Sequence, residues 1–307
     1  MPTHVLCPID FSPASLRALR YAAAFAVWYA ARLEVLHVAP AVDSGLVPTP
    51  ADRREDDPPY PRSREAIVAA IEGAIGSAGA GGVNPTAVVL EGRAHERIAH
   101  RAQAAPADLI VMGTHGRSGV QRLLLGSVTE TLMRTAPCPL LTVPPAAPAV
   151  GAAALTLDRI LCPIDHSPSS LAALQYALDL GKRTDSGVTV LYALEYMDPD
   201  DHLEVSPLDP CHGASVESRR RHEHLLDHAR ARLHAQLEAV AVSGSPIEAV
   251  VVADRAYKAI LRHAAESRAD LIVMGAQGSG GLELLLYGSN TQHVVRAATC
   301  PVLTVRA

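Results

Sequence analysis

One stretch of the chain combines residue types that suit the binding of an anion. The apolar run Leu109–Met112 ends at Gly113, Gly116 follows, and Gly126 and Ser127 then open an amphipathic run. A short apolar run, a loop without Cβ atoms and a helix start indicate a buried parallel strand that feeds a helix. Backbone N–H groups in such a loop can approach an anion, and a helix N-terminus adds unpaired donors and partial positive charge. The stretch therefore predicts a phosphate site.

The same arrangement occurs a second time. The pattern Gly-x2-Gly-x9-Gly-Ser returns with identical spacing at Gly275, Gly278, Gly288 and Ser289. A single glycine-rich loop is weak evidence, because ordinary turn glycines look much the same. Two copies in matching contexts favour a binding site in each half of the chain.

The repeat also includes the first strand of each half. His4–Pro13 and Arg159–Pro168 share the pattern x-x-Leu-Cys-Pro-Ile-Asp-x-Ser-Pro, in which Asp10 and Asp165 follow an apolar run. The Ser-Pro pairs predict a capping serine before proline at the first helical position. Because serine already supplies a helix cap, we expect the two aspartates to contact a ligand instead.

Apolar strands alternate with amphipathic helices in each half, and the fold class is therefore α/β. The strands are too apolar to be half exposed, which predicts a parallel sheet covered by helices on both faces. The end strands at 139–143 and 301–305 would be exposed edges in isolated halves, and we expect them to pair within one chain. In the first half the other predicted elements are strands near 4–9, 33–39, 86–91 and 108–112, and helices near 13–31, 63–77, 94–104 and 127–136.

Length and composition suit two domains. A chain of 307 residues corresponds to two units of about 150 residues each. We place the first domain at 1–144 and the second at 157–307, joined at 145–156 by a Pro/Ala linker with nothing to bury. The loops at 40–62 and 196–222 are expected to be exposed and mobile.

Charge and composition argue against several classes of protein. The net charge is −5 without a long basic run, so nucleic acid is not an expected partner. The N-terminus has no charged leader and no apolar run approaches the ~18 residues of a membrane span, which predicts a cytoplasmic protein. Lys182 and Lys258 are the only lysines and neither stands in a P-loop pattern. Cysteines that repeat with their strands are expected to be buried small apolar residues rather than disulfide partners, namely Cys7, Cys138, Cys162 and Cys300.

On these residues the chain resembles the universal stress protein family, in its tandem form with two domains in one polypeptide. The resemblance rests on Asp10 and Asp165, on the repeated glycine pattern and on the closing Cys-Pro-x-Leu-Thr-Val strands. It covers nearly the whole chain outside the linker and the two long loops. It implies two doubly wound domains, each with a five-stranded parallel sheet in the order 3-2-1-4-5. It also implies that this glycine pattern marks the members that bind ATP.

The expected ligand is ATP, with or without Mg²⁺, in each half. In a doubly wound sheet the ligand lies beyond the carboxyl ends of the strands, where the strand order reverses. The resemblance places Asp10 and Asp165 beside the nucleoside or a phosphate-bound Mg²⁺, and Val38 is expected to pack on the adenine. Ala193 is its counterpart, for which a generic core role is the alternative. The expected nucleotide-binding residues are Pro8, Asp10, Val38, Gly113, Gly116, Arg117, Gly126, Ser127, Val128, Pro163, Asp165, Ala193, Gly275, Gly278, Gly288, Ser289 and Asn290.

Together with the resemblance, which implies a role in the stress response, these features favour an ATP-binding regulatory protein, and no catalytic residues are expected. His115 in the first loop is matched by Gln277 in the second, which weakens it as a catalytic base. The alternatives are a slow adenine-nucleotide hydrolase that uses the same pockets, and an interaction protein whose sites stay empty. We expect the two halves to pair as a pseudo-dimer, and a homodimer of whole chains stays open.

Two further features bear on the relative ATP affinity of the two sites and on metal binding. Arg117 and Arg122 are matched by uncharged residues in the second loop, which predicts tighter ATP binding in the first half. His224 and His228 lie four positions apart on a helix predicted at about 216–240, a spacing that can hold a metal. A solvated helix face is the favoured interpretation, and no metal site is expected.

Overall fold

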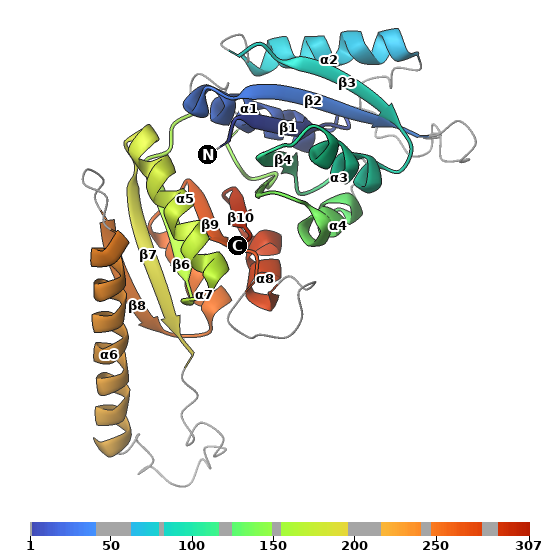
Figure 1. The fold of residues 1–307 in the computed structure, drawn as a ribbon. Helices are drawn as coiled ribbons and strands as arrows, with labels where there is room; N and C mark the ends of the chain where they lie inside the picture. The colour runs from blue at the N-terminus through green and yellow to red at the C-terminus, as the bar shows by residue number, and fades with distance from the viewer. Residues whose placement is uncertain are drawn as a thin grey trace.

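The first half of the chain alternates strands and helices from its N-terminus. The computed structural model describes residues 2–40, 63–79, 83–116, 125–148, 155–195, 216–240, 247–277 and 288–307. The described elements of the first half, shown in Figure 1, are β1 (His4–Pro8), α1 (Pro13–Tyr29), β2 (Arg32–Ala39), α2 (Arg64–Ala78), β3 (Thr86–Glu91), α3 (Ala94–Ala104), β4 (Leu109–Gly113), α4 (Ser127–Thr135) and β5 (Leu140–Val143).

The second half repeats this order of elements. They are β6 (Arg159–Ile164), α5 (Pro168–Thr184), β7 (Gly187–Leu194), α6 (Val216–Val240), β8 (Ile247–Ala253), α7 (Ala256–Glu266), β9 (Leu271–Gly275), α8 (Ser289–Ala297) and β10 (Val302–Val305). The alternation predicted for both halves is confirmed, and each element whose bounds were predicted begins and ends within two residues of its prediction.

Local chemistry explains where the first helix of each half begins. The Ser12 hydroxyl accepts the N–H of Ser15 at 3.2 Å, and the Ser167 hydroxyl accepts that of Ser170 at 3.2 Å. A proline follows each serine at the start of its helix. The predicted serine caps are therefore confirmed, and they satisfy N–H groups that have no partner within the helix.

All ten described strands form a single sheet. Its order is β3-β2-β1-β4-β5-β10-β9-β6-β7-β8, so each half has the order 3-2-1-4-5 that was expected. Every neighbouring pair is parallel except β5 and β10, which pair antiparallel with Leu141 opposite Leu303. The hydroxyls of Thr142 and Thr304 donate across this junction to the carbonyls of Val302 and Leu140, both at 3.1 Å. The predicted pairing of the two end strands is thus confirmed.

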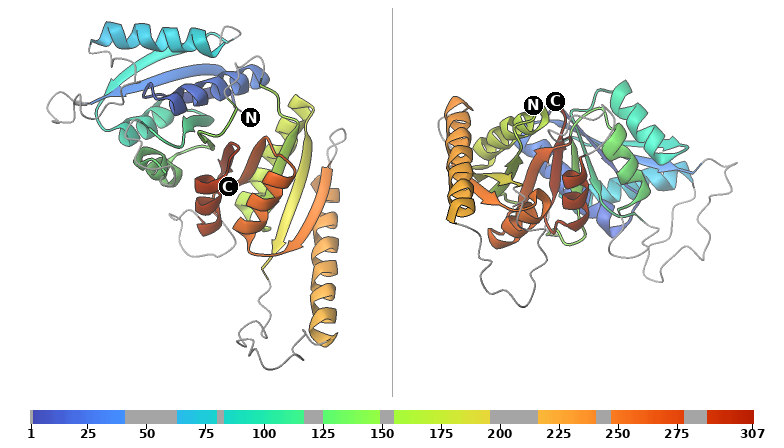
Figure 2. Two further views of the ribbon diagram at one scale, coloured as in Figure 1. Left: turned by 180° about the vertical axis from the view of Figure 1, so that it is seen from behind. Right: turned by 90° about the horizontal axis from the view of Figure 1, so that it is seen from below.

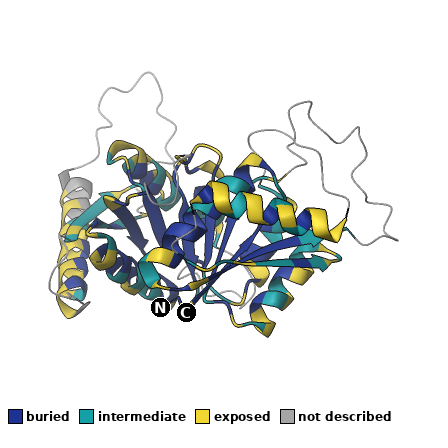
Figure 3. Ribbon diagram, turned by 90° about the horizontal axis from the view of Figure 1, so that it is seen from above, coloured by how far each residue is buried: buried dark blue, intermediate teal, exposed yellow. Residues whose placement is uncertain are grey.

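Helices cover both faces of the sheet (Figures 1 and 2). The helices α1, α2, α5 and α6 pack on one face, and α3, α4, α7 and α8 pack on the other. Figure 3 shows the strands as the buried layer, with the exposed residues on the outer sides of the helices. The apolar layer under α1 and α5 continues from one half into the other. There Tyr29 and Tyr176 lie with ring centroids 6.2 Å apart, and the Arg183 guanidinium lies 4.7 Å from the Tyr29 ring centroid.

The expectation that residues 145–156 bury nothing is wrong. Ala147 and Leu155 are buried and belong to the apolar layer under α1 and α5, as does Leu157 just beyond the segment. Their small and medium apolar side chains fill space at the junction of the two halves, which local composition does not indicate. Residues 149–154 of this segment lie outside the described residues, as do the predicted loops over 41–62 and 196–215.

The cysteines in the described residues are free thiols, as expected. Cys7, Cys162 and Cys300 are buried and Cys138 is half-buried, whereas Cys211 lies outside the described residues. Burial raises the pKa of Cys138 and of Cys300 to about 12, which makes both thiols unreactive at neutral pH. Among the described helices, none combines the length and the apolar character needed to cross a bilayer.

Candidate functional site

In each half the candidate site lies at the carboxyl edge of the sheet, where the strand order reverses. In the first half β1 and β4 are neighbours, with Val5 opposite Leu109. The helix after β1 packs on one face of the sheet and the helix after β4 packs on the other. This divergence brings the residues that follow the two strands to one edge, which is where doubly wound proteins bind ligands.

Asp10 and Gly116 meet at this edge. A Cβ atom built on Gly116 would lie 2.9 Å from Oδ2 of Asp10, closer than real Cβ contacts. Gly116 is exposed and Asp10 is half-buried. The glycine therefore leaves room beside a carboxylate that a larger residue would occupy or displace.

The chain turns sharply after Asp10, and hydrogen bonds hold the carboxylate. Its Oδ1 accepts the N–H of Ser12 at 3.0 Å, and its own N–H donates to the Ser15 hydroxyl at 3.2 Å. Phe11 takes a left-handed conformation (φ 64°), which is costly for a residue with a Cβ atom. Its ring lies 4.8 Å from that of His37, whose Nδ1 lies 2.8 Å from the Ile9 carbonyl oxygen. Packing thus stabilises the strained turn that presents Asp10.

The second half repeats this geometry around Asp165. The N–H of Ser167 donates to Asp165 Oδ1 at 3.0 Å, and the N–H of Asp165 donates to the Ser170 hydroxyl at 3.3 Å. His166 takes the left-handed conformation (φ 62°), and its ring lies 4.8 Å from that of Tyr192. The loops after β1 and β6 thus share a left-handed residue and the same two backbone hydrogen bonds around the aspartate.

The N-terminus of α4 lies beside the glycine loop. The N–H of Gly126, the cap residue, donates to the Thr114 carbonyl at 2.8 Å, which holds the helix start against the residues after β4. The Thr129 hydroxyl donates to the Gly113 carbonyl at 3.0 Å. Glu130 supplies the first N–H that bonds back to the cap, so the N–H groups of residues 127–129 have no acceptor within the helix. Together with the helix dipole they form a site suited to an anion.

The N-terminus of α8 has the same construction. The N–H of Gly288 donates to the Ala276 carbonyl at 3.1 Å, and the Thr291 hydroxyl donates to the Gly275 carbonyl at 3.0 Å. Ser127 and Ser289, the first residues of the two helices, are both exposed. Each half therefore presents a helix N-terminus beside a strand-end carboxylate.

Gly113 and Gly275 have a packing role. Each is the buried last residue of its strand, and a Cβ atom on Gly113 would lie 3.0 Å from the backbone of Ala14 in α1. At Gly275 the added atom would lie 2.8 Å from both the Ser169 hydroxyl and the Ser170 nitrogen. These two glycines let the first helix of each half approach the sheet, and their contact with a ligand stays a prediction.

The expected adenine wall lies on the face that α3 and α4 cover. Val38 and Val128 are half-buried and pack against the same apolar cluster. In the second half Ala193 packs against the corresponding part of that cluster, while Asn290 replaces the second valine. Pro8 and Pro163 are buried within β1 and β6. Arg117, Arg122 and Gly278 lie outside the described residues.

The two sites differ in their hydrogen bonds. Ser169 donates to the backbone carbonyl of Gln277. The residue matching Ser169 in the first half is Ala14, which has no hydroxyl. The second glycine loop is thus fastened to the start of α5 by a bond that the first site lacks.

Sequence reasoning missed the hydroxyls that hold these sites together. Ser15 and Ser170 bind the aspartate loops, and Thr129 and Thr291 bind the ends of the glycine strands. All four are buried on helices. Their signal is repetition, because each hydroxyl recurs at the matching position of the other half.

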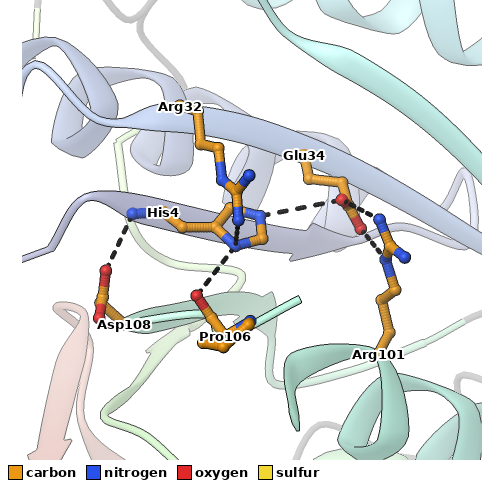
Figure 4. Close-up of polar contacts among 6 residues, drawn as sticks. All are labelled: His4, Arg32, Glu34, Arg101, Pro106 and Asp108. Carbon is orange, nitrogen blue, oxygen red and sulfur yellow. Dashed lines mark hydrogen bonds and ion pairs between the residues drawn. The ribbon is translucent and has the colours of Figure 1, made fainter. Parts of the chain in front are cut away.

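A second polar cluster lies at the opposite, amino edge of the first half's sheet (Figure 4). Arg101 donates two hydrogen bonds to the buried Glu34 carboxylate, at 2.7 and 2.6 Å. His4 Nε2 lies 3.8 Å from Glu34 Oε2, and Arg32 Nη2 lies 3.0 Å from His4 Nδ1. Hydrogen bonding to Glu34 raises the pKa of Arg101. The cluster is remote from the site edge, and we assign it a structural role.

Asp108 ties the same edge to the N-terminus of the chain. Its Oδ2 accepts the N–H and the hydroxyl of Thr3, both at 2.8 Å, and the N–H of His4 at 3.0 Å. Burial alone would raise the pKa of Asp108, but these hydrogen bonds together hold it below its ordinary value. Asp270 repeats the backbone contacts in the second half, where it accepts the N–H groups of Asp158 and Arg159 at 2.9 Å.

The histidines considered as metal ligands are on the surface. His224 and His228 are both exposed on α6. Within the described ranges, no three or more His, Cys, Asp or Glu side chains gather in a way that could hold a metal ion.

Comparison with known proteins identifies relatives over nearly the whole chain. The chain matches the Universal stress protein family twice, over residues 1–144 and 156–306. A universal stress protein of Mycobacterium tuberculosis is 31% identical over 209 residues, which are 65% of this chain and 62% of that protein. One of Methanocaldococcus jannaschii is 33% identical over 161 residues, which are 48% of this chain and 81% of that protein. The chain thus spans less than two thirds of the mycobacterial relative's length.

Solved structures share the fold. A universal stress protein from Archaeoglobus fulgidus superposes with a TM-score of 0.65 at 20% identity, covering 99% of this chain and 96% of that one. A protein from Pseudomonas aeruginosa, described as a putative universal stress protein, superposes with a TM-score of 0.67 at 18% identity. The match covers 99% of this chain and 93% of that one. The expected tandem α/β architecture is therefore confirmed.

Proposed function

The chain belongs to the universal stress protein family, and we propose that each of its halves binds one ATP molecule and that the protein acts as a nucleotide-responsive regulator in the stress response. The observation that carries this proposal is the meeting of Asp10 and Gly116 beside the start of α4. A carboxylate suits a ribose hydroxyl or a Mg²⁺ ion, and helix N–H groups that have no acceptor within the helix suit phosphates. The repeat of both features in the second half supports two sites.

The residues present fit a nucleoside triphosphate. In the first half the N–H groups of residues 127–129 would hold phosphate oxygens, and the exposed Ser127 hydroxyl would add a donor. Asp10 would contact the ribose or a phosphate-bound Mg²⁺, and Val38 would pack on the adenine. Asp165, Ala193 and residues 289–291 would do the same in the second half.

Binding rather than turnover is the proposed activity. Phosphoryl transfer depends on a cation at the γ-phosphate and on a group that orients the attacking water. Among the described residues at the carboxyl edges of the two sheets, the polar side chains that both halves share are hydroxyls and one carboxylate. These shared side chains include neither a cation for the γ-phosphate nor an established group that orients water. We therefore propose a regulator that responds to nucleotide and releases it largely intact, acting in the cytoplasm.

The junction of the two halves supports a pseudo-dimer within one chain. β5 and β10 pair antiparallel, so each half covers the other's terminal strand. An uncovered strand edge would invite pairing with another chain. We propose that the tandem arrangement takes the place of a homodimer between single-domain chains.

The nucleotide released from purified protein tests the proposal. Mass spectrometry of the small molecules freed by denaturation should find an adenine nucleotide, and single-turnover assays should show hydrolysis slower than minutes. Faster hydrolysis would favour an enzyme. A protein that purifies empty and gives no binding heat with added ATP would contradict the proposal.

A further inference from the structure

The two helices that face the candidate sites contact each other across the junction of the halves. Glu130 lies in the first turn of α4, one turn beyond Ser127, and Arg296 lies in the last turn of α8. Arg296 Nη2 lies 3.6 Å from Glu130 Oε1. The same carboxylate oxygen lies 3.8 Å from Arg134 of its own helix. Glu130 therefore has one cation from each half of the chain.

The C-terminal end of α4 is also completed by the other half. Arg306 follows β10, and its Nη2 donates to the carbonyls of Met133 at 2.7 Å and Arg134 at 2.5 Å. These carbonyls belong to the last turn of α4, where a helix leaves acceptors without intrahelical partners. A cation there also opposes the negative end of the helix dipole. The first half's phosphate-facing helix is thus held at its far end by the second half.

These contacts occur on one side of the junction only. The residue matching Glu130 in α8 is Gln292, and the residue matching Arg306 is Pro144. Neither can form the reciprocal ion pair or cap. Communication through these polar contacts therefore depends on Glu130, Arg296 and Arg306.

We propose that Glu130, Arg296 and Arg306 are positioning residues that couple the two nucleotide sites, so that ATP in one half strengthens ATP binding in the other. The coupling rests on the proposed function. Helices of nine residues, such as α4 and α8, are marginal without tertiary contacts. A phosphate at the start of α4 orders that helix and, through the shared contacts, its partner α8. The second ligand then meets a helix that is already ordered, which gives positive cooperativity.

The size of the effect follows from the exposure of the contacts. The Glu130 and Arg296 side chains are 38% and 44% exposed, so water weakens their attraction. We expect the second ATP to bind about two- to fivefold more tightly than it would to an isolated site.

Titration of ATP into single-site variants measures the coupling. In Asp165→Ala only the first site should bind ATP, and in Asp10→Ala only the second. The two measured affinities together give the binding curve expected for a chain with two independent sites. The unsubstituted chain should bind its second ATP more tightly than the curve for independent sites predicts. The variants Arg296→Gln and Arg306→Ala should each bind ATP as that curve predicts.

Arg134→Gln is the matched control. Arg134 touches the same carboxylate oxygen as Arg296 but lies on α4, so its loss leaves the contact between halves in place. This variant should keep the cooperativity. Equal loss in Arg134→Gln and Arg296→Gln would overturn the proposal, because the ion pair would then act only on α4 itself.

Hydrogen exchange supplies a readout that a merely structural role would not change. In the Asp165→Ala chain, ATP at the first site should slow exchange of amides in the last turn of α8, and Arg296→Gln should abolish that effect. Unchanged exchange in α8, or a full-chain isotherm equal to the independent-site curve, would overturn the coupling alone. Absence of binding heat in every variant would instead overturn the proposed nucleotide sites, and the coupling with them.

Discussion

A Cβ atom on Gly116 would lie 2.9 Å from Oδ2 of Asp10, although more than one hundred residues separate the two in the chain. The contact exists because β1 and β4 are neighbours at the centre of the first half's sheet. Asp10 comes shortly after β1 and Gly116 shortly after β4, so both lie at the carboxyl edge of the sheet, beside the start of α4. The glycine keeps open the space next to the carboxylate, and the proposed nucleotide site depends on that space.

Replacing Gly116 with valine should block the first site without unfolding the protein. The new side chain would displace a carboxylate that the Ser12 N–H holds. Because Gly116 is exposed, we expect the free energy of unfolding to change by less than about 1 kcal/mol. ATP affinity in the Asp165→Ala background should fall about tenfold or more, which calorimetry measures and which corresponds to about 1.4 kcal/mol.

Gly73→Val is the matched control for that substitution. Gly73 lies in α2, and a Cβ atom added there would meet no neighbouring side chain or strand within 4 Å, so the position should tolerate the same replacement. The control should bind ATP as the unsubstituted chain does. Equal ATP affinity in the Gly116 and Gly73 variants would refute the placement of the site.

The two sites should differ in affinity, with the first one tighter. Val38 and Val128 present more apolar surface than Ala193 and Asn290 do. Burial of apolar surface contributes about 25 cal/mol per Å², so the loss of two valines weakens contact with an adenine. Calorimetric titration of Asp10→Ala and Asp165→Ala should show the higher affinity in the chain that keeps Asp10. If the Asp10→Ala chain binds ATP more tightly than the Asp165→Ala chain, the second site has the higher affinity and the prediction is wrong.

Arg101→Ala should destabilise the first half and leave nucleotide binding intact. The substitution would leave the buried Glu34 carboxylate without its two strongest hydrogen bonds. Breaking a buried pair costs about 3–5 kcal/mol, and the partial exposure of Arg101 reduces this to about 2–3 kcal/mol. Denaturant unfolding measures the loss. ATP affinity should be unchanged because Glu34 lies at the amino edge of the sheet.

Arg230→Ala is the control for an exposed ion pair. Arg230 pairs with Asp227 at 3.0 Å on α6, with both side chains more than half exposed. Its loss should change the free energy of unfolding by less than about 1 kcal/mol. Equal destabilisation in the two arginine variants would show that Glu34 and Arg101 do not form a stabilising buried pair.

A fragment of residues 1–146 should dimerise through β5. In the full chain β10 covers this strand, and both strands are buried. The fragment would expose an apolar edge, which favours pairing with a second copy. Circular dichroism would establish that the fragment is folded, and light scattering after gel filtration would give its mass. A folded fragment that stays monomeric at high concentration would argue against the pseudo-dimer.

Local sequence patterns predicted the elements that surround the site. The run Leu109–Met112 followed by glycine marks β4, and Ser12 before Pro13 marks the start of α1, because both signals act within a few residues. The repeat made each interpretation stronger. The pairing of β5 with β10 followed from the apolar character of both end strands.

Contacts made by the tertiary fold escaped prediction. Gly113 is glycine because Ala14 approaches it, and Arg306 caps α4 from the other half of the chain. Neither partner can be found without the strand order and the junction of the halves. Ala147 and Leu155 were expected in an unburied linker, since composition alone does not indicate that the junction buries them.

The stoichiometry of ATP binding tests the central claim most directly. Calorimetric titration of the full chain should give two ATP molecules per chain. Asp10→Ala and Asp165→Ala should each give one, and the double variant none, while all four proteins keep the same circular dichroism spectrum. Two molecules bound by the folded double variant, or none bound by the unsubstituted chain, would contradict nucleotide binding at these two edges of the sheet.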